Sequence, residues 1–295
     1  MGTTALDHPA ALQWSVRKTR RPRTTVPKVS VIIPAKNEAA NLPHVIPALP
    51  DIVSEVVLVD GRSTDDTVAV ARSLRPDIIV VPQSYRGKGD AVACGFAMAT
   101  GDIIVMIDAD GSTDPAEIPL FVDALINGAD FAKGSRYLPE GGSEDLTWLR
   151  RTGNLGLTGL VNLLFGARYT DLCYGYNAFW RDCLTSLNLD STGFEIETQL
   201  NLRAVKVGLV IQEVPSMERN RIHGESNLHP VRDGLRVLRT IMRERFSRLH
   251  APGPAWAALT GQLRFEEEIE AVVGDVAVVG GEVAMPRLLE GPTDA

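Results

Sequence analysis

The chain has 295 residues, of which 44% are hydrophobic and 23% charged, and its net charge is -7. This composition is ordinary for a soluble globular protein with a sizeable core and one or two domains. The acidic balance argues against a nucleic-acid-binding protein, which usually carries excess positive charge. The sequence shows neither a secretory signal nor a long apolar run, so we expect no transmembrane helix. The three cysteines form no CxxC pair and no compact disulfide framework, which favours a cytoplasmic location.

The two ends of the chain differ in character from its centre. Residues 1–28 form a basic arm that we expect to be flexible, with a cluster of lysines and arginines between positions 17 and 28. Such charge runs are usually solvated tails, although they also attract anionic lipid head groups. Residues 251–295 form an acidic tail that we expect to be partly disordered.

Residues 29–227 alternate between strand and helix patterns, beginning with a β-branched run typical of a strand buried on both faces. The expected strands are Val29–Ile33, Glu55–Val59, Asp77–Val81, Ile103–Ile107 and Phe131–Ala132. The expected helices are Asn37–Leu49, Ser63–Leu74 with Ser63 or Thr64 as N-cap, Gly89–Thr100 and Pro115–Asn127. This rhythm predicts an α/β fold with a doubly wound, mostly parallel sheet that binds ligands at the carboxyl ends of its strands. Residues 134–227 are less regular and are expected to form an acceptor-side lobe on the same core.

Residues 228–250 are expected to form an amphipathic helix. Leu235, Leu238, Ile241 and Met242 share one side, and arginines surround the rest. Such a stripe either packs on the catalytic domain or, together with the basic arm, binds weakly to an anionic membrane. We therefore expect a cytoplasmic protein that can lie peripherally on the inner face of the cell membrane.

Asp108-Ala109-Asp110 ends an apolar strand and is followed by a Gly-Ser-Thr turn. Acids after a strand are often turn or capping residues. Two carboxylates one residue apart can also converge on one hard cation, Mg²⁺ or Mn²⁺. A sugar-diphosphate leaving group needs such a cation, because negative charge builds on the phosphate as the glycosidic bond breaks.

Other polar groups follow the first three strands. Residues 34–38 can bind a nucleoside at a helix N-terminus, or form an ordinary strand-to-helix turn. The carboxylate of Asp60 can accept hydrogen bonds from ribose hydroxyls or base N–H groups, or it can cap the following helix. Lys88, between two glycines, suits close approach to a diphosphate.

In order and spacing, these segments resemble glycosyltransferase family two, and within it the dolichyl-phosphate and polyprenyl-phosphate sugar synthases. The resemblance covers about residues 29–228 and rests on VSVIIPAKNE, VLVDGRSTDDT, RGKGDA, MIDADGSTDP, KGSRY, TDLCYGYNAFWR and RNRIHGESNL. It implies a GT-A fold, a UDP- or GDP-linked sugar as donor, a divalent metal ion and inversion at the anomeric carbon.

The resemblance also implies roles for individual residues. The donor nucleotide would contact Pro34, Ala35, Asn37, Glu38, Asp60, Lys88, Asp108 and Ala109. The metal ion would be held by Asp108 and Asp110. The acceptor would contact Ser135, Arg136, Arg221 and Ser226, and the arginines suit the oxygens of a phosphate. The catalytic residues would be Asp110, Arg136, Asp171 and Arg221.

Three positions depart from the family pattern: Gly61 replaces the second acid of a pair, Leu155 an arginine, and Asn227 a lysine. The last two remove positive charge where a lipid phosphate would bind.

If the acceptor is a hydroxyl, Asp171 is the candidate general base. If it is a phosphate monoester, it arrives ionised and Asp171 only orients the site. Glu197 is interpreted as either a site acid or a helix-face acid, and His223 as a diphosphate contact or a structural histidine.

The expected function is transfer of a hexose, mannose or glucose, from a nucleotide sugar to polyprenyl phosphate. The alternative is a soluble enzyme of the same family that glycosylates a hydroxyl of a small molecule or saccharide. A nucleotidyltransferase would need a basic glycine-rich loop after the first strand, which PAKNEAAN does not provide. A non-catalytic scaffold would have no use for Asp108 and Asp110 with Lys88.

Overall fold

A computed structural model describes residues 13–14, 26–225 and 229–247 of the chain. The expected acidic tail lies outside the described residues, and so does most of the basic arm. Ser226, expected at the acceptor, and Asn227 also lie outside them. The expected division of the chain into four regions stays a prediction.

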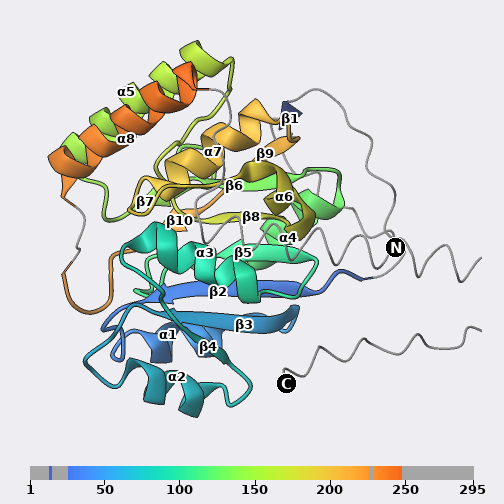
Figure 1. The fold of residues 1–295 in the computed structure, drawn as a ribbon, viewed down its shortest axis with the longest axis vertical. Coiled ribbons are helices and arrows are strands. Elements are labelled where there is room, and N and C mark those ends of the chain that lie inside the picture. The colour runs from blue at the N-terminus through green and yellow to red at the C-terminus, as the bar shows by residue number, and fades with distance from the viewer. Residues whose placement is uncertain (1–12, 15–25, 226–228, 248–295) are drawn as a thin grey trace, which may run out of the picture.

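The described residues form one eight-stranded mixed sheet and one small two-stranded sheet (Figure 1). The strands are β1 (Gln13–Trp14), β2 (Val29–Ala35), β3 (Val53–Asp60), β4 (Ile79–Pro82), β5 (Ile103–Met106), β6 (Phe131–Ser135), β7 (Gly142–Ser143), β8 (Asn177–Trp180), β9 (Ile211–Pro215) and β10 (Met217–Glu218). The order in the large sheet is β1-β9-β6-β8-β5-β2-β3-β4, and β10 pairs with β7.

Most of the large sheet runs in one direction. The β2–β3, β2–β5, β3–β4 and β6–β9 pairs are parallel, whereas β8 runs antiparallel to both β5 and β6. The carboxyl ends of β2, β3, β4, β5, β6 and β9 therefore meet at one edge of the sheet, where α/β folds bind ligands. The predicted doubly wound, mostly parallel α/β sheet is confirmed.

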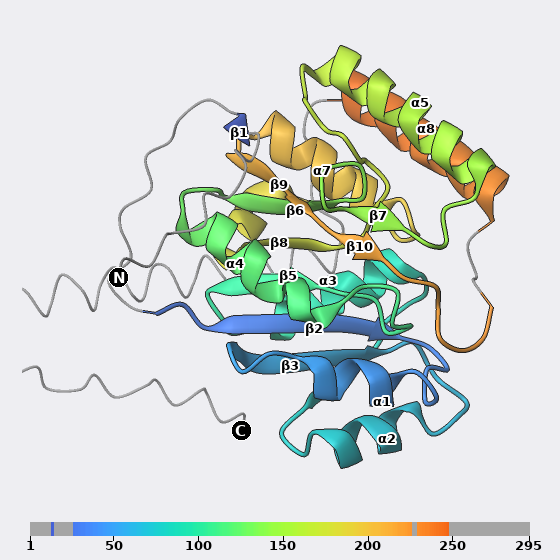
Figure 2. The same cartoon turned by 180° about the vertical axis from the view of Figure 1, so that it is seen from behind.

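Helices cover both faces of the sheet. They are α1 (Leu42–Val45), α2 (Thr67–Leu74), α3 (Lys88–Met98), α4 (Ile118–Ile126), α5 (Trp148–Phe165), α6 (Leu184–Leu187), α7 (Ile196–Lys206) and α8 (Pro230–Phe246), with short 3₁₀ turns at Ile46–Ala48, Pro115–Glu117 and Arg181–Cys183. Figures 1 and 2 show α3 and α7 on one face and α4 on the other. The central strands β2, β3 and β5 are buried over most of their length between these layers, which is why they read as largely apolar runs.

Two predicted helices begin later than expected. The helix expected from Asn37 begins only at Leu42, and Pro43 and Pro47 divide it into α1 and a 3₁₀ turn. The helix expected from Ser63 begins at Thr67, so neither Ser63 nor Thr64 is its N-cap. In both places the preceding residues form loops at the carboxyl edge of the sheet instead.

The amphipathic helix expected near the C-terminus is present as α8. It lies beside α5 in both views (Figures 1 and 2) and also packs on α7. Of its apolar stripe, Ile241 is fully buried, whereas Leu235, Leu238 and Met242 remain exposed. The stripe is thus only partly used for packing. Among the described residues, no helix is both long and apolar enough to cross a membrane.

Candidate active site

A cavity of about 1960 Å³ opens at the carboxyl edge of the sheet. Drug-sized ligand pockets usually measure roughly 300–1,000 Å³, so this one has room for two substrates. The predicted site residues that line it are Pro34, Ala35, Asn37, Glu38, Lys88, Asp108, Ala109, Asp110, Arg136 and Arg221. The predicted residues Asp60, Ser135 and Asp171 are not among its lining.

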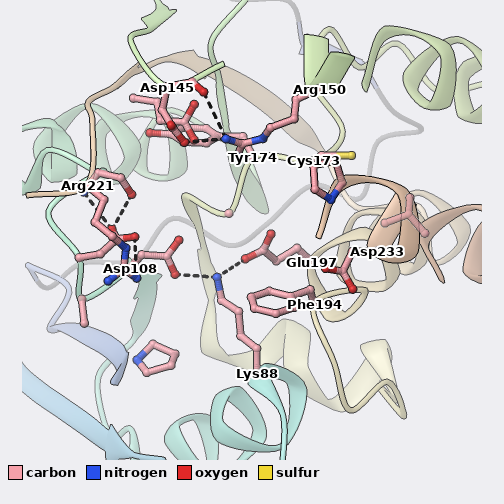
Figure 3. A pocket seen from close by; sticks show the side chains of 18 of the residues that line it. Lys88, Asp108, Asp145, Arg150, Cys173, Tyr174, Phe194, Glu197, Arg221 and Asp233 are labelled. Carbon is pink, nitrogen blue, oxygen red and sulfur yellow. Dashed lines mark hydrogen bonds and ion pairs between the residues drawn. The ribbon is translucent and has the colours of Figure 1, made fainter. Parts of the chain in front are cut away.

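Lys88 stands between two carboxylates on the cavity wall (Figure 3). Its Nζ lies 2.6 Å from Oδ1 of Asp108 and 2.5 Å from Oε1 of Glu197, which belongs to α7. Burial alone would lower the pKa of Lys88, but the two carboxylates raise it above its usual range. Burial in turn raises the pKa of Glu197, against the effect of Lys88. Glu197 is therefore a cavity acid, the first of the two interpretations that its sequence allowed.

The loop that carries Lys88 is fitted closely against a distant segment. A Cβ atom at Gly87 would lie 2.2 Å from the carbonyl oxygen of Thr192, and one at Gly89 would lie 2.2 Å from that of Ser191. The amide of Gly89 also donates to the Thr192 carbonyl over 2.9 Å. Because any side chain at these positions would collide with backbone, the two glycines are needed here to seat Lys88.

Asp110 and Glu38 share a second cation, Arg221. Nη2 of Arg221 lies 3.3 Å from Oδ2 of Asp110 and 3.0 Å from Oε1 of Glu38. The Nε atom of Arg221 is buried and has no hydrogen-bond partner among the described residues. The segment that carries Arg221 is tied down on both sides, by the amide of Ile222 to the Asp110 carbonyl and by that of His223 to Oδ1 of Asn41. His223 also lines the cavity.

The loop after β2 differs from the predicted helix start. Asn37 has a positive φ of 59°, and its Oδ1 accepts the amide of Thr64 over 2.8 Å, so it holds the two loops after β2 and β3 together. Asp60 uses its carboxylate inside the second loop, where Oδ1 accepts the amide of Ser63 over 3.1 Å. Asp60 therefore ties down the loop after β3 and does not cap α2, whose N-cap is Asp66, and its contact with the nucleoside stays a prediction.

Arg136 was expected to face the acceptor; it lines the cavity, but its side chain is only 3% exposed. Its Nε and Nη2 donate to the two oxygens of Asp171 over 2.7 and 2.9 Å, and its Nη1 donates to Glu218 over 2.9 Å. The guanidinium also lies 4.9 Å from the ring centre of Tyr174. Each of its three nitrogens thus donates to a carboxylate of the protein, while Nη1 and Nη2 each keep a second N–H. The predicted role of Arg136 in binding the acceptor phosphate stays a prediction.

Asp171 does not fit the predicted role of general base. Its side chain is fully buried, and it also accepts from Asn154 over 2.7 Å. Burial alone would raise the pKa of Asp171, but the hydrogen bonds and charge of Arg136 hold it below its usual value. A carboxylate that is buried, paired and acidic neither reaches an acceptor nor takes up its proton readily. Ser135 is likewise fully buried, and its hydroxyl faces Thr170.

Two carboxylates of the cavity wall, Asp108 and Asp110, fit a divalent metal ion. Asp108 and Asp110 both line the cavity from one loop, and no cluster of three or more acidic, histidine or cysteine ligands occurs among the described residues. Mg²⁺ is usually held by one or two carboxylates together with substrate phosphates, rather than by a complete protein cage. The residues present therefore match an ion that binds together with a nucleotide.

Beyond the carboxylates, the same cavity continues between α5 and α8 as an apolar groove. Its walls are formed by Leu149, Leu157 and Leu160 from α5 and by Val231, Leu235 and Leu238 from α8. Gly153 and Gly156 also line it and face open space. The sequence analysis missed the α5 wall, although the spacing of its leucines and glycines could have indicated an apolar helix face.

Arg150, at the first turn of α5, was also missed. It lines the cavity, and its Nη1 lies 2.6 Å from Oδ2 of Asp145, another lining residue (Figure 3). The only signal in the sequence was a pair of arginines after a tryptophan, which by itself is compatible with an ordinary solvated helix start.

Comparison with known proteins agrees with this geometry. The family model described as glycosyl transferase family 2 matches residues 30–187. Polyprenol monophosphomannose synthase from Mycolicibacterium smegmatis is 34% identical, over 67% of this chain and 80% of that protein. Undecaprenyl-phosphate mannosyltransferase from Micrococcus luteus is 32% identical, over 68% of this chain and 87% of that protein.

The fold is similar to that of a solved structure, with a TM-score of 0.62. That structure is glucosyl-3-phosphoglycerate synthase from Mycobacterium tuberculosis in complex with Mn²⁺, UDP and phosphoglyceric acid. It is 25% identical, and the match covers 78% of this chain and 85% of that one. The fold, the ordered motifs and these likenesses lead to one conclusion. The chain is a glycosyltransferase of the GT-A fold and belongs to glycosyltransferase family 2.

Proposed function

We propose that the protein transfers a hexose from a nucleotide-diphosphate sugar to polyprenyl phosphate, with the help of Mg²⁺ or Mn²⁺. The observation that carries this proposal is the continuity of the cavity, which runs from Asp108 and Asp110 into the apolar groove between α5 and α8. A polar donor and an apolar acceptor chain need such a combination of surfaces. The names of two relatives support it, because they specify polyprenol and undecaprenyl phosphate.

Asp108 and Asp110 would hold the metal ion against the diphosphate of the donor. When bound, the ion neutralises the negative charge that builds on the leaving diphosphate. Lys88 carries a firmly held positive charge beside Asp108, so it would lie within reach of the same phosphates. Residues 34–38 line the far part of the cavity and would receive the nucleoside.

In the transfer, an oxygen of the acceptor phosphate forms a bond to the anomeric carbon. The bond from that carbon to the diphosphate oxygen breaks, and the nucleoside diphosphate leaves. A phosphate monoester has its second pKa near ~6, so the attacking oxygen needs no general base at neutral pH. This chemistry agrees with the burial of Asp171. Attack from the face opposite the diphosphate would invert the anomeric centre.

Arg221 is suited to the space between the two substrates. Its guanidinium balances Asp110 and Glu38, and its unpartnered Nε would be satisfied by a phosphate oxygen. A buried N–H without a partner costs free energy. A phosphate oxygen that accepts a hydrogen bond from it would remove that cost and bind more tightly.

The exposed apolar side chains of α5 and α8 fit a peripheral contact with the membrane that contains the acceptor. Trp148, Leu163, Val231 and Phe246 are all exposed. Arginines of α8 flank this surface and would attract anionic head groups. We place the protein on the cytoplasmic side, where nucleotide sugars would be available to it.

A second candidate is transfer to a hydroxyl of a small phosphorylated metabolite. The likeness to a solved glucosyl-3-phosphoglycerate synthase favours it, because that enzyme was crystallised with UDP and phosphoglyceric acid. The apolar groove argues for the lipid, since a small polar acceptor would leave it unused.

One experiment separates these functions. The purified protein is incubated with Mg²⁺ or Mn²⁺ and a panel of UDP- and GDP-linked mannose and glucose. Each reaction contains either polyprenyl phosphate in detergent, phosphoglyceric acid, or no acceptor, and mass spectrometry identifies the products. A glycosylated polyprenyl phosphate is the expected product. Glycosylated phosphoglycerate alone would instead establish the second candidate.

A further inference from the structure

We infer that Gln199 is a positioning residue for the sugar donor: through residues 190–192 it holds the loop that carries Lys88 in place on the cavity wall. This inference rests on the proposed function, because it takes Lys88 to lie within reach of the donor diphosphate. Gln199 is not among the residues that line the cavity, so it would act on the donor only through that loop.

The first step of the argument is the side chain of Gln199, which belongs to α7 and is fully buried. Its Oε1 accepts the amides of Asp190 and Ser191 over 2.9 and 2.8 Å. Its Nε2 donates to Oδ1 of Asp190 and, over 2.9 Å, to Oε1 of Glu244. A primary amide has two acceptor sites and two N–H groups, and here all four are used. Gln199 therefore fixes both the backbone and the carboxylate of Asp190.

The second step is what this segment supports. The next residue along the chain, Thr192, accepts the amide of Gly89 on its carbonyl over 2.9 Å. The two glycines beside Lys88 have no room for a side chain against Ser191 and Thr192, so backbone lies against backbone there. Contacts this close leave the Lys88 loop little freedom while the segment stays in place. If the segment moves, the loop loses its support.

The third step is that α7 holds Lys88 at a second point. Glu197, two residues before Gln199 on the same helix, lies 2.5 Å from Nζ of Lys88 (Figure 3). One helix thus positions both the backbone of the loop and the amine at the end of its side chain. The amine must also reach Asp108, at 2.6 Å, and a misplacement of about 1 Å is enough to weaken such contacts considerably.

The fourth step is that α8 holds the same segment from the other side. Oε1 of Glu244 accepts from Gln199 and also from Nε and Nη2 of Arg203, over 3.0 and 2.9 Å. Nη2 of Arg243 donates to Oδ1 of Asp190 over 3.2 Å and to the hydroxyl of Ser191 over 3.3 Å. The helix that forms one wall of the apolar groove therefore also supports the loop at the donor end of the cavity.

The test uses the full-length protein and two measurements. Hydrogen exchange followed by mass spectrometry reports how often the loop around Gly89 opens. Calorimetry with UDP or GDP, in the presence of Mn²⁺, reports the binding of a nucleoside diphosphate. The variants are Gln199→Met, which keeps a similar volume but has no amide, Lys88→Met, and the two substitutions combined.

Asn201 offers a matched control. It lies on the same helix and is also fully buried, but its side chain donates to the carbonyl of Leu172 over 3.0 Å and not to residues 190–192. Asn201→Leu should lower the stability of the fold, as Gln199→Met does. Hydrogen exchange around Gly89 and the affinity for the nucleotide should nevertheless stay close to those of the wild type. The control therefore separates a general loss of stability from a loss of positioning.

In Gln199→Met two buried amides lose their acceptor, so hydrogen exchange around Gly89 should speed up by about ten- to a hundredfold. The Kd of the nucleoside diphosphate should rise by about three- to tenfold, and less than in Lys88→Met. The double variant should bind like Lys88→Met, because Gln199 acts through Lys88. Unchanged exchange around Gly89, or losses that add fully in the double variant, would overturn the inference.

Arg243→Ala replaces the methionine variant if thermal unfolding shows that the latter is not folded. Arg243 is 41% exposed and holds the same segment from outside, so exchange around Gly89 should then rise by about two- to fivefold. The proposed function fails in a different way. A wild type that binds neither UDP nor GDP would refute the proposed donor, whereas hydrogen exchange would still decide whether Gln199 supports the Lys88 loop.

Discussion

Two arginines that look alike in the sequence have opposite surroundings in the structure. Arg136 borders the cavity but belongs to a buried layer beneath its wall, where its carboxylate partners and an aromatic ring leave its side chain 3% exposed. Arg221 lies on the cavity wall, partly exposed, and shares the carboxylates of Asp110 and Glu38. Both stand in family motifs, so the motif alone does not tell a charge that binds a substrate from one that holds the fold.

The difference extends to the groups around them. The wall contains charges that a ligand can reach: Lys88, Asp108, Asp110 and Arg221 all line the cavity. The layer beneath contains pairs that are closed to solvent, such as Arg136 with Asp171 and Arg203 with Glu244. Changes in the wall should therefore reduce activity with little effect on stability, and changes in the layer beneath should do the reverse.

The largest effect is expected from Asp110→Asn on the wall. It weakens the proposed metal ligand and should lower kcat by orders of magnitude, while the unfolding temperature changes little. Steady-state kinetics with saturating metal ion, together with thermal unfolding, would measure both. Activity near that of the wild type, or full activity of the wild type in EDTA, would refute the role of this carboxylate.

A comparable loss, in stability instead of catalysis, is expected from Asp171→Asn in the layer beneath. The substitution removes one partner of a buried ion pair and leaves Arg136 partly uncompensated, which typically costs about 3–5 kcal/mol of unfolding free energy. Urea denaturation of the variant and the wild type checks this. If instead Asp171→Asn stays as stable as the wild type but inactive, the residue is catalytic and the comparison between wall and layer breaks down.

A smaller catalytic effect is expected from Arg221→Ala. Losing a contact of roughly 1.5–3 kcal/mol with phosphate should raise the acceptor KM or lower kcat by about ten- to a hundredfold. Donor binding and stability should stay close to those of the wild type. The two KM values, measured separately, decide whether the arginine serves the acceptor, since a change in donor KM alone would assign it to the nucleotide.

A pH-dependent effect on stability is expected at Glu244, which ties α8 to α7. Burial would raise the pKa of Glu244, but hydrogen bonds from Arg203, Lys206 and Gln199 lower it to about 2, from a usual 4.5. Because the folded pKa is depressed, the stabilisation is fully present above about pH 4.5 and disappears as the pH falls towards 2.

Glu244→Gln should therefore be less stable than the wild type at neutral pH, and the difference should shrink in acid. Urea denaturation at pH 7, 4 and 3 follows this convergence. A difference in unfolding free energy that stays constant over that range would show that the charge of Glu244 plays no part.

Much of the fold could be predicted because it follows from local patterns. The apolar run at Val29–Ile33 matches a strand that is buried on both faces, and Asp108 and Asp110 sit where a buried strand ends. The late starts of α1 and α2 were missed because they depend on Asn37, whose positive φ and bond to Thr64 join two loops. Nothing in either loop alone indicates that contact.

The site was predicted less completely than the fold, for a similar reason. Whether Asp171 faces a substrate depends on Arg136, which follows β6 and lies 35 residues away in the chain. Whether Glu197 reaches the cavity depends on how α7 packs beside Lys88, and the groove exists only because α5 and α8 lie together. Burial and pairing between distant segments decide these roles, and neither is visible in a motif.

The seating of Gly87 and Gly89 against Ser191 and Thr192 also bears on where this protein can be cut. The family model ends at residue 187, before that segment, and before β9, which pairs with β6 inside the sheet. A truncation at that limit would keep every motif up to the DxD carboxylates, yet strip the support from the Lys88 loop and expose a strand edge. The segment matched by the family model is thus shorter than the piece that we expect to fold as a catalyst.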